Sequence, residues 1–367
     1  MESSRDRVLK AVRHEQPDIV PVNFSNMYDP VKWFDHFDVD SSSALRDRLG
    51  FDIESARPVY TGPYAARNLD IWGTPIEGVF GADGVGYSGE RNGYPLARAE
   101  TVADIERFPW PDPDDFDYDA CARALKAIPD SKAKRLDCKY GIRQEGKTPA
   151  ESQGGGSWLP LVCTLFNLFG LEQTLINFRS APHLNEAALK HLETFTLEFV
   201  RRSLDAAGGQ ADFLFYGDDF STQQGLMISP EDWRRYLKPV FGSVFALAKE
   251  RGVKVWFHSC GQFRPVLPDL IDLGLDVWEA VQVHLEGNDP RELKRDYGRH
   301  ITFFGAISTQ QTLPFGTTEQ VRAEVRERIR VLGEGGGYIC GPDHGVMPDI
   351  PIENGLALID EARGFRF

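Results

Sequence analysis

The strongest constraint on the fold is a regular alternation of short apolar runs and longer amphipathic segments, which begins near residue 130. The short runs read as buried strands, and the longer segments carry apolar residues at helical spacing. The predicted strands cover 159–164, 212–216, 253–258, 276–281, 301–305 and 338–340, and the predicted helices cover 183–207, 230–248, 264–273, 291–297, 319–332 and 352–363. This alternation is typical of parallel βαβ units.

The first 130 residues are less regular and read as decoration of the same fold. The predicted elements are a helix over 4–14, a strand over 19–24, β-hairpins and loops over 40–110, an acidic, proline-broken linker over 110–120 and a helix near 118–128. We therefore expect a single domain over 1–367, with a decorated N-terminal part (1–130) and the main βα repeats in 131–367.

Composition narrows the partners and the compartment. The net charge of −14 and the pI near 5.1 argue against nucleic acid and anionic membranes as main partners, since both need a basic surface. Five cysteines in 367 residues are too few, and odd in number, for a disulfide framework, which favours the reducing cytoplasm. We expect no signal peptide, and no run approaches the ~20 apolar residues that span a bilayer.

Two architectures fit the alternation, a doubly wound sheet and a (β/α)8 barrel. The barrel is favoured because reactive side chains fall at or just after strand C-termini, the usual active-site face of a barrel. These residues are Asp218, Asp219, His258, Gln282, Cys340 and His344. No G-x-G-x-x-G follows a first strand, so a dinucleotide site is not indicated. The glycine run 154–156 is predicted to be a flexible loop over the barrel mouth.

Three soft-metal ligands stand out among these residues. His258 and Cys260 lie in V-K-V-W-F-H-S-C-G, and Cys340 closes a second apolar run, G-G-G-Y-I-C-G-P-D-H. One imidazole and two thiolates suit Zn²⁺, and three protein ligands leave a coordination position open for chemistry. The alternative is that both cysteines are small buried residues and His258 is a core histidine.

With these residues set out, the chain resembles the uroporphyrinogen decarboxylase superfamily over nearly its whole length. The resemblance is carried by S-R-D-R-V-L-K-A-V-R-H-E-Q-P-D-I-V-P-V, G-D-D-F-S-T-Q-Q-G-L-M-I-S-P-E-D-W-R-R-Y-L-K-P, H-S-C-G-Q-F-R-P-V-L-P-D-L-I-D-L-G, F-F-G-A-I-S-T-Q-Q-T-L-P-F-G-T and the G-G-G-Y-I-C-G-P-D-H tail. It implies a (β/α)8 TIM barrel with N-terminal loop and hairpin insertions.

The resemblance also separates two branches. True decarboxylases carry an arginine-rich segment that grips substrate carboxylates, whereas the matching region here, V-P-V-N-F-S-N-M-Y-D-P, has no arginine. The H-x-C…C set is instead similar to the zinc-dependent methylcobalamin:coenzyme M methyltransferases and corrinoid-linked demethylases. In that branch His258, Cys260 and Cys340 would be the zinc ligands, and a separate corrinoid protein would be the partner.

Several functions stay open at this point. The first is zinc-dependent methyl transfer, in either direction, between a corrinoid protein and a thiol such as coenzyme M, a methoxylated aromatic (O-demethylation) or a methylamine. A metal-free decarboxylase-like lyase, a binding subunit without turnover and a zinc hydrolase are the alternatives. Methyl transfer agrees best with the ligand set, because a zinc-bound thiol ionises near neutral pH and the thiolate is the nucleophile.

Two aspartates follow the strand that ends in G-D-D. Asp218 or Asp219 is predicted to supply a fourth zinc ligand or to orient His258. The alternative for both is helix capping and loop hydrogen bonding.

Three further residues are candidates for contacts with substrate or cofactor. His344 is predicted to face the pocket, Gln282 to line it and Arg264 to contact an anion; a turn, a polar strand end and a surface salt bridge are the respective alternatives. The three other cysteines, Cys121, Cys138 and Cys163, are predicted to be structural.

Overall fold

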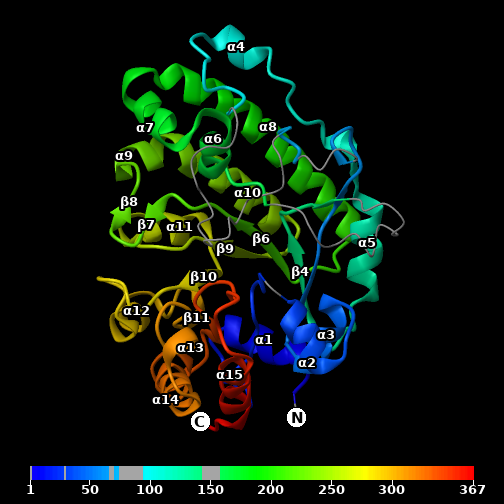
Figure 1. Cartoon of the computed structure of the whole chain (residues 1–367), viewed down its shortest axis with the longest axis vertical. Coiled ribbons are helices and arrows are strands. Elements are labelled where there is room, and N and C mark those ends of the chain that lie inside the picture. The colour runs from blue at the N-terminus through cyan, green and yellow to red at the C-terminus, as the bar shows by residue number, and fades with distance from the viewer. Residues whose placement is uncertain (1, 29, 66–69, 74–93, 143–157) are drawn as a thin grey trace.

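The central element is a seven-stranded sheet whose neighbouring strands are all parallel. A computed structural model describes residues 2–28, 30–65, 70–73, 94–142 and 158–367 (Figure 1). The strand order is β1 (Ile53–Ala56), β4 (Ala133–Asp137), β6 (Phe213–Gly217), β9 (Lys254–His258), β10 (Val277–Val281), β11 (Thr302–Ile307) and β12 (Tyr338–Pro342). The predicted parallel βα architecture is confirmed.

Helices cover the outer face of this sheet. The main ones are α5 (Tyr118–Ala127), α6 (Val162–Phe169), α7 (Leu171–Ser180), α8 (Pro182–Ala207), α10 (Lys238–Glu250), α11 (Leu267–Leu273), α12 (Pro290–Tyr297), α14 (Thr318–Arg328) and α15 (Ile352–Gly364). Helix α10 packs on β9 and α14 packs on β11. The helices predicted near 118–128 and over 183–207, 291–297 and 352–363 match this order to within a few residues.

Shorter elements complete the described chain. They are α2 (Val31–Phe37), α3 (Ser42–Leu49), α4 (Val102–Glu106), α9 (Pro230–Asp232), α13 (Thr312–Phe315), the small sheet of β2 (Val59–Tyr60), β3 (Phe116–Asp117) and β5 (Gly141–Ile142), and the hairpin of β7 (Ser221–Thr222) and β8 (Gly225–Leu226). Among all the residues that the structure describes, no helix is long and apolar enough to cross a membrane.

The two faces of the sheet bury different clusters, because side chains alternate along each strand. The inner cluster includes Phe213, Phe215, Trp256, Phe304 and Ile339. The outer cluster lies under the helices and takes the intervening residues of the same strands. Both faces are buried, as is usual for a parallel sheet.

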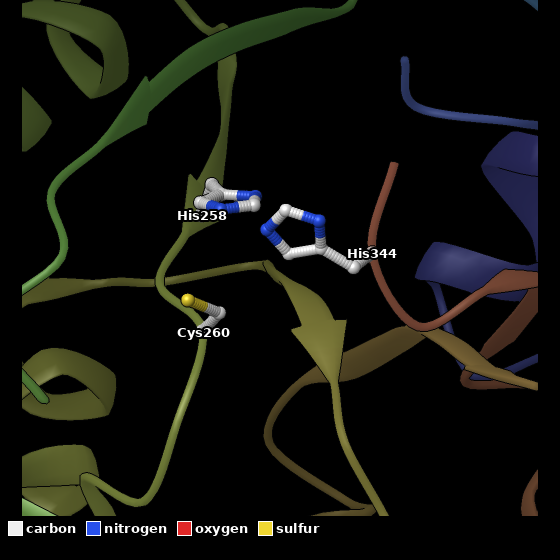
Figure 2. Close-up of side chains that lie close together, drawn as sticks. All are labelled: His258, Cys260 and His344. Atoms are coloured by element: carbon white, nitrogen blue, oxygen red, sulfur yellow. The ribbon is translucent and has the colours of Figure 1, made fainter. Parts of the chain in front are cut away.

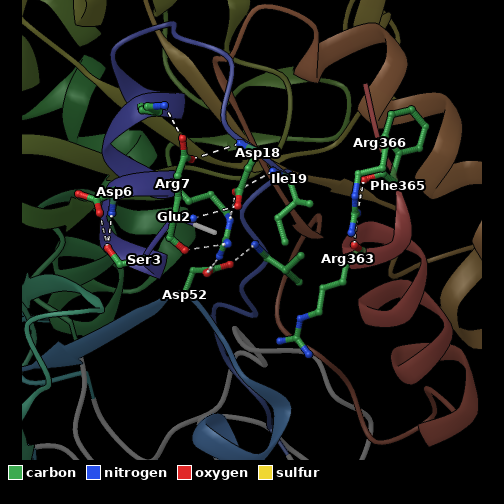
Figure 3. A network of polar contacts seen from close by, with 12 residues as sticks. Glu2, Ser3, Asp6, Arg7, Asp18, Ile19, Asp52, Arg363, Phe365 and Arg366 are labelled. Atoms are coloured by element: carbon green, nitrogen blue, oxygen red, sulfur yellow. Dashed lines mark hydrogen bonds and ion pairs between the residues drawn. The ribbon is translucent and has the colours of Figure 1, made fainter.

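Helix α1 (Ser4–Val12) closes one end of the inner cluster, to which it contributes Val8 and Val12. An ion-pair network anchors it (Figure 3). The guanidinium of Arg7 contacts Asp18 at 3.0 Å and Asp52 at 2.7 Å. The second oxygen of Asp52 accepts the backbone N–H of Val22 at 2.7 Å. Helix α1 therefore occupies one end of the strands, and the reactive side chains lie at the opposite, C-terminal end.

The segment around Val22 touches both edges of the sheet. Val22 forms a parallel bridge with Cys340 of β12, and its carbonyl accepts the N–H of Asp52, which directly precedes β1. The predicted strand over 19–24 thus appears as a single bridge. The sheet is curled, so that its two edge strands approach the same short segment.

Two sequence predictions need correction, and one strand was missed. The run 159–164, predicted to be a strand, begins helix α6 at Val162. Residues 40–110, predicted to form β-hairpins and loops, also contain helix α3, which is N-capped by Ser41, and strand β1 of the main sheet. Strand β4 was not predicted, because its sequence A-K-R-L-D is too polar to read as buried. The glycine run 154–156 lies outside the described residues.

Candidate metal site

His258 ends strand β9 on the inner face of the sheet, where its ring lies 6.3 Å from that of Phe215 and 5.2 Å from that of Trp158. The neighbouring strand β6 approaches closely, and a Cβ on Gly217 would lie 2.8 Å from the carbonyl oxygen of His258. Only glycine fits there without displacing the backbone. The G-D-D sequence therefore sets the position of His258.

A buried carboxylate fixes the orientation of His258. Glu279 of β10 is 1% exposed, and its Oε1 lies 3.0 Å from Nδ1 of His258. Its Oε2 accepts from Arg135 at 3.0 Å and from Trp256 at 2.5 Å, and Ser25 donates to Oε1. Burial pushes the pKa of Glu279 upward, but the hydrogen bond from His258 and the charge of Arg135 hold it below its ordinary value. An ionised Glu279 keeps the proton on Nδ1, which leaves Nε2 to bind a metal.

The loop after β9 presents Cys260. Asp219 accepts the backbone N–H of Cys260 at 3.1 Å, and Gln282 accepts that of Gly261 at 2.8 Å. Burial, followed by the charge of Asp219, raises the pKa of the Cys260 thiol well above its ordinary value. A cation beside this sulfur would reverse that effect, since metal-bound thiols are deprotonated.

His344 reaches the same place from the loop after β12. This loop pairs with the N-terminal segment through the bridge between Met27 and Val346, and Tyr28 stacks on the His344 ring with centroids 6.2 Å apart. Burial, and then the proximity of His258, lower the pKa of His344. A neutral imidazole is the form that binds a metal.

His258, Cys260 and His344 form one cluster (Figure 2). One ligand atom from each lies within 4.8 Å of the others. In a tetrahedral zinc site, nitrogen and sulfur ligands lie about 3.5 Å apart. Small side-chain rotations would close this difference. Two imidazoles and one thiol therefore fit a zinc ion, with a further position open.

Cys340 is not brought to this cluster. It lies in the outer cluster with Tyr338, whereas Ile339 between them faces inward. Cys340 is completely buried, and burial raises the pKa of its thiol to about 12. The predicted set of His258, Cys260 and Cys340 is thus not assembled, and His344 takes the third position.

The remaining candidates have visible structural partners. Asp218 accepts the backbone N–H groups of residues 161, 162 and 163 at 2.8–3.2 Å and so caps helix α6, although burial raises its pKa to about 7. Asp219 lies 3.8 Å from Nε2 of His258. Arg264 is held by Glu292 at 3.0 Å and Asp296 at 2.6 Å.

Sequence reasoning missed two residues of the site, Glu279 and Tyr28. The signal for Glu279 was present, because a lone carboxylate in the apolar run V-W-E-A-V must find buried partners. Tyr28 gave no comparable signal, since its contact with His344 depends on how a loop crosses the end of the sheet.

A family model described as uroporphyrinogen decarboxylase (URO-D) matches residues 84–365. The chain belongs to the URO-D family. Relatives in this family carry names for different reactions. A methylcobamide:CoM methyltransferase, MtaA, from Methanosarcina barkeri is 29% identical over 36% of this chain and 36% of its own length. A uroporphyrinogen decarboxylase from Thermus thermophilus is 29% identical over 46% of this chain and 47% of its own length.

One further curated relative and one solved structure carry methyltransferase names. A methylated-thiol–coenzyme M methyltransferase from Methanosarcina mazei is 27% identical over 53% of this chain and 50% of its own length. The matches to these curated relatives thus span about a third to a half of their lengths. Among solved structures, a methyltransferase from Methanosarcina mazei superposes with a TM-score of 0.61 over 100% of this chain and 99% of its own, at 18% identity. This structural similarity supports the parallel α/β fold described above.

Proposed function

We propose that this protein is a zinc-dependent methyltransferase that moves a methyl group between a corrinoid carried by a partner protein and a thiol or methylated small molecule. The observation that carries the proposal is the cluster of His258, Cys260 and His344 at the end of the sheet. The relatives named as methyltransferases support the same reading.

Each residue has a task that follows from its contacts. Glu279 holds the His258 ring, so that Nε2 faces the cluster. Asp219 and Gln282 hold the loop that presents Cys260. When bound, zinc would lower the pKa of a substrate thiol or polarise the heteroatom that carries the methyl group. Asp219 is our candidate for a fourth ligand in the absence of substrate, because its Oδ1 lies 3.8 Å from Nε2 of His258.

Decarboxylation, the alternative, is less well supported. In true decarboxylases the N-terminal segment supplies arginines, whereas here it places the hydroxyl of Ser25 on Glu279 and the ring of Tyr28 on His344. This segment supports the ligands and offers no guanidinium for substrate carboxylates.

We also infer that the sheet closes into a (β/α)8 barrel. The support is the segment around Val22, which contacts β12 on one side and the residue before β1 on the other. A closed barrel would leave its C-terminal mouth as the approach for a corrinoid protein, as in other TIM-barrel enzymes.

Methyl transfer from free methylcobalamin tests the function. Purified protein loaded with zinc is mixed with methylcobalamin and a panel of thiols, and loss of the methylcobalamin absorbance is followed. We expect turnover with at least one thiol, and loss of turnover in His258→Ala. Phe315→Ser, which changes an exposed residue of α13, is the control. Stoichiometric zinc without transfer in either direction would refute the methyltransferase assignment.

A further inference from the structure

Tyr28 is held beside the candidate metal site by its backbone and by its ring. Its N–H donates to the carbonyl of Val346 at 3.0 Å, and the N–H of Val346 donates to the carbonyl of Asn26 at 2.8 Å. The ring of Tyr28 stacks on that of His344, with centroids 6.2 Å apart. The N-terminal segment and the loop after β12 thus fix the ring next to a candidate ligand.

A glycine makes room for this ring. Gly345 directly follows His344, and a Cβ built on it would overlap Cε2 of Tyr28 and lie 3.0 Å from its Cζ. Any residue with a side chain at 345 would therefore displace the ring. Because Cζ carries the hydroxyl, this end of Tyr28 packs directly on the loop that presents His344.

The hydroxyl of Tyr28 faces the acidic groups of the site. Burial raises its pKa, and the next causes are the negative charges of Asp219, Cys260 and Glu279. Asp219 and Cys260 follow strands β6 and β9, and Glu279 belongs to β10, whereas Tyr28 enters beside the loop after β12. A phenol in these surroundings keeps its proton, so it acts as a hydrogen-bond donor.

Asn26 sets the direction of this donor. Its side chain hydrogen-bonds to the Tyr28 hydroxyl and opposes the rise in its pKa, which is the effect of a donor on the phenol oxygen. Because the oxygen accepts from Asn26, the proton of the hydroxyl is directed away from Asn26. On the other side lies the site itself, where a substrate heteroatom beside Cys260 and His344 can accept the hydrogen bond.

We propose that the Tyr28 hydroxyl donates a hydrogen bond to the substrate heteroatom that carries the methyl group and stabilises the negative charge which this atom gains as the methyl leaves. The inference rests on the proposed function and adds a catalytic residue to it. When a thioether is demethylated, its carbon–sulfur bond breaks and the electron pair of that bond stays on sulfur. The pair for the new cobalt–carbon bond comes from a Co(I) corrinoid, and the proton stays on Tyr28.

A donor at this atom acts differently on the two directions of transfer. It stabilises a thiolate relative to the thioether, so it favours removal of the methyl group from the thioether and tightens binding of the thiolate. Loss of the hydroxyl should therefore lower kcat in one direction and raise KM in the other. A residue that only supported His344 would act through zinc affinity and change both directions alike.

Tyr28→Phe removes the hydroxyl and keeps the ring on His344. Titration calorimetry of 2-mercaptoethanol on the zinc-loaded protein is expected to show binding about tenfold weaker or more in this variant, the size of a hydrogen bond to a charged group. Zinc affinity should match that of the wild type. Tyr236→Phe, in the outer cluster against Phe178 of α7, is the matched control and should bind thiol and zinc as the wild type does.

Kinetics in both directions give a second measure. With 2-(methylthio)ethanol and cob(I)alamin, kcat of Tyr28→Phe should fall about tenfold or more while KM stays the same, since a neutral thioether gains little from the donor. With 2-mercaptoethanol and methylcobalamin, KM should rise and kcat should not fall. A fall in kcat by the same factor in both directions would contradict a hydrogen bond to the heteroatom.

The inference and the proposed function fail separately. Weaker thiol binding by Tyr28→Phe, without methyl transfer in either direction by any of the proteins, would refute the proposed function and support the role of the hydroxyl. Methyl transfer with the same constants in the wild type and Tyr28→Phe would overturn the inference alone. Equal thiol binding by the two proteins, no thiol binding by the wild type, or loss of zinc from Tyr28→Phe would overturn it as well.

Discussion

Replacement of Glu279 by glutamine is the perturbation with the most distinct consequence. Four donors converge on the two oxygens of this carboxylate, from Ser25, Arg135, Trp256 and His258. Glutamine offers one oxygen and one NH2 group, so the NH2 must face donors with which it cannot bond. Glu279→Gln therefore removes hydrogen bonds to the carboxylate and the negative charge that compensates Arg135. The volume of the side chain stays almost the same.

The size of the effect follows from burial. Glu279 and Arg135 are both almost completely inaccessible, with side chains 2% and 4% exposed. Removal of one partner of such a pair costs about 3–5 kcal/mol of folding free energy. Asp137 still compensates Arg135, so we expect the lower value, about 3 kcal/mol. Loss of the carboxylate behind a ligating histidine lowers metal affinity about 10–100-fold.

Urea unfolding and competition with a zinc chelator measure the two effects. Glu54→Gln is the matched control, because Glu54 is a buried carboxylate of β1 paired with Arg46 and Lys132 and has no contact with His258. The control should lose stability and keep its zinc affinity. If Glu279→Gln binds zinc as tightly as Glu54→Gln does, Glu279 does not orient a ligand and the reasoning fails.

Two other perturbations follow from particular contacts. Gly217→Ala places a Cβ 2.8 Å from the carbonyl oxygen of His258, and should cost about 1–3 kcal/mol of stability and weaken zinc binding. Gly364→Ala, in open space, should do neither, and equal zinc affinity in both variants would count against the close approach. Burial lowers the pKa of Lys294 from 10.5 to about 8. Between these two pH values the unfolded chain binds more protons than the folded chain. The free energy of unfolding of the wild type should therefore rise with pH across this window, relative to that of Lys294→Met. Urea unfolding measures it, and a free energy of unfolding that falls with pH would contradict the prediction.

The order of elements could be predicted from the sequence because strands and helices have different apolar periods. The prediction of a strand over 159–164 was wrong because a short apolar run fits a buried strand and a buried helix equally well. Asp218 decides the outcome, because it accepts the first N–H groups of α6. That contact joins residues far apart in sequence and leaves no local pattern.

The third ligand could not be predicted because β12 is buried on both faces. All five residues of Tyr338–Pro342 are buried, so the sequence does not reveal which alternate side chains face inward. Cys340 falls on the outer face, and His344, four residues later, returns to the inner side through a loop. Both residues were visible as candidates in C-G-P-D-H, and the register of strand β12 decides which of them faces the site.

Zinc stoichiometry of three proteins tests the central claim most directly. Metal analysis after dialysis against a weak chelator should find close to one zinc per chain in the wild type and in Cys340→Ala. His344→Ala should lose zinc, because removal of a ligand should weaken binding by more than the about 10–100-fold that loss of a carboxylate behind a ligand costs. Zinc retained in His344→Ala and lost in Cys340→Ala would contradict a site built from His258, Cys260 and His344.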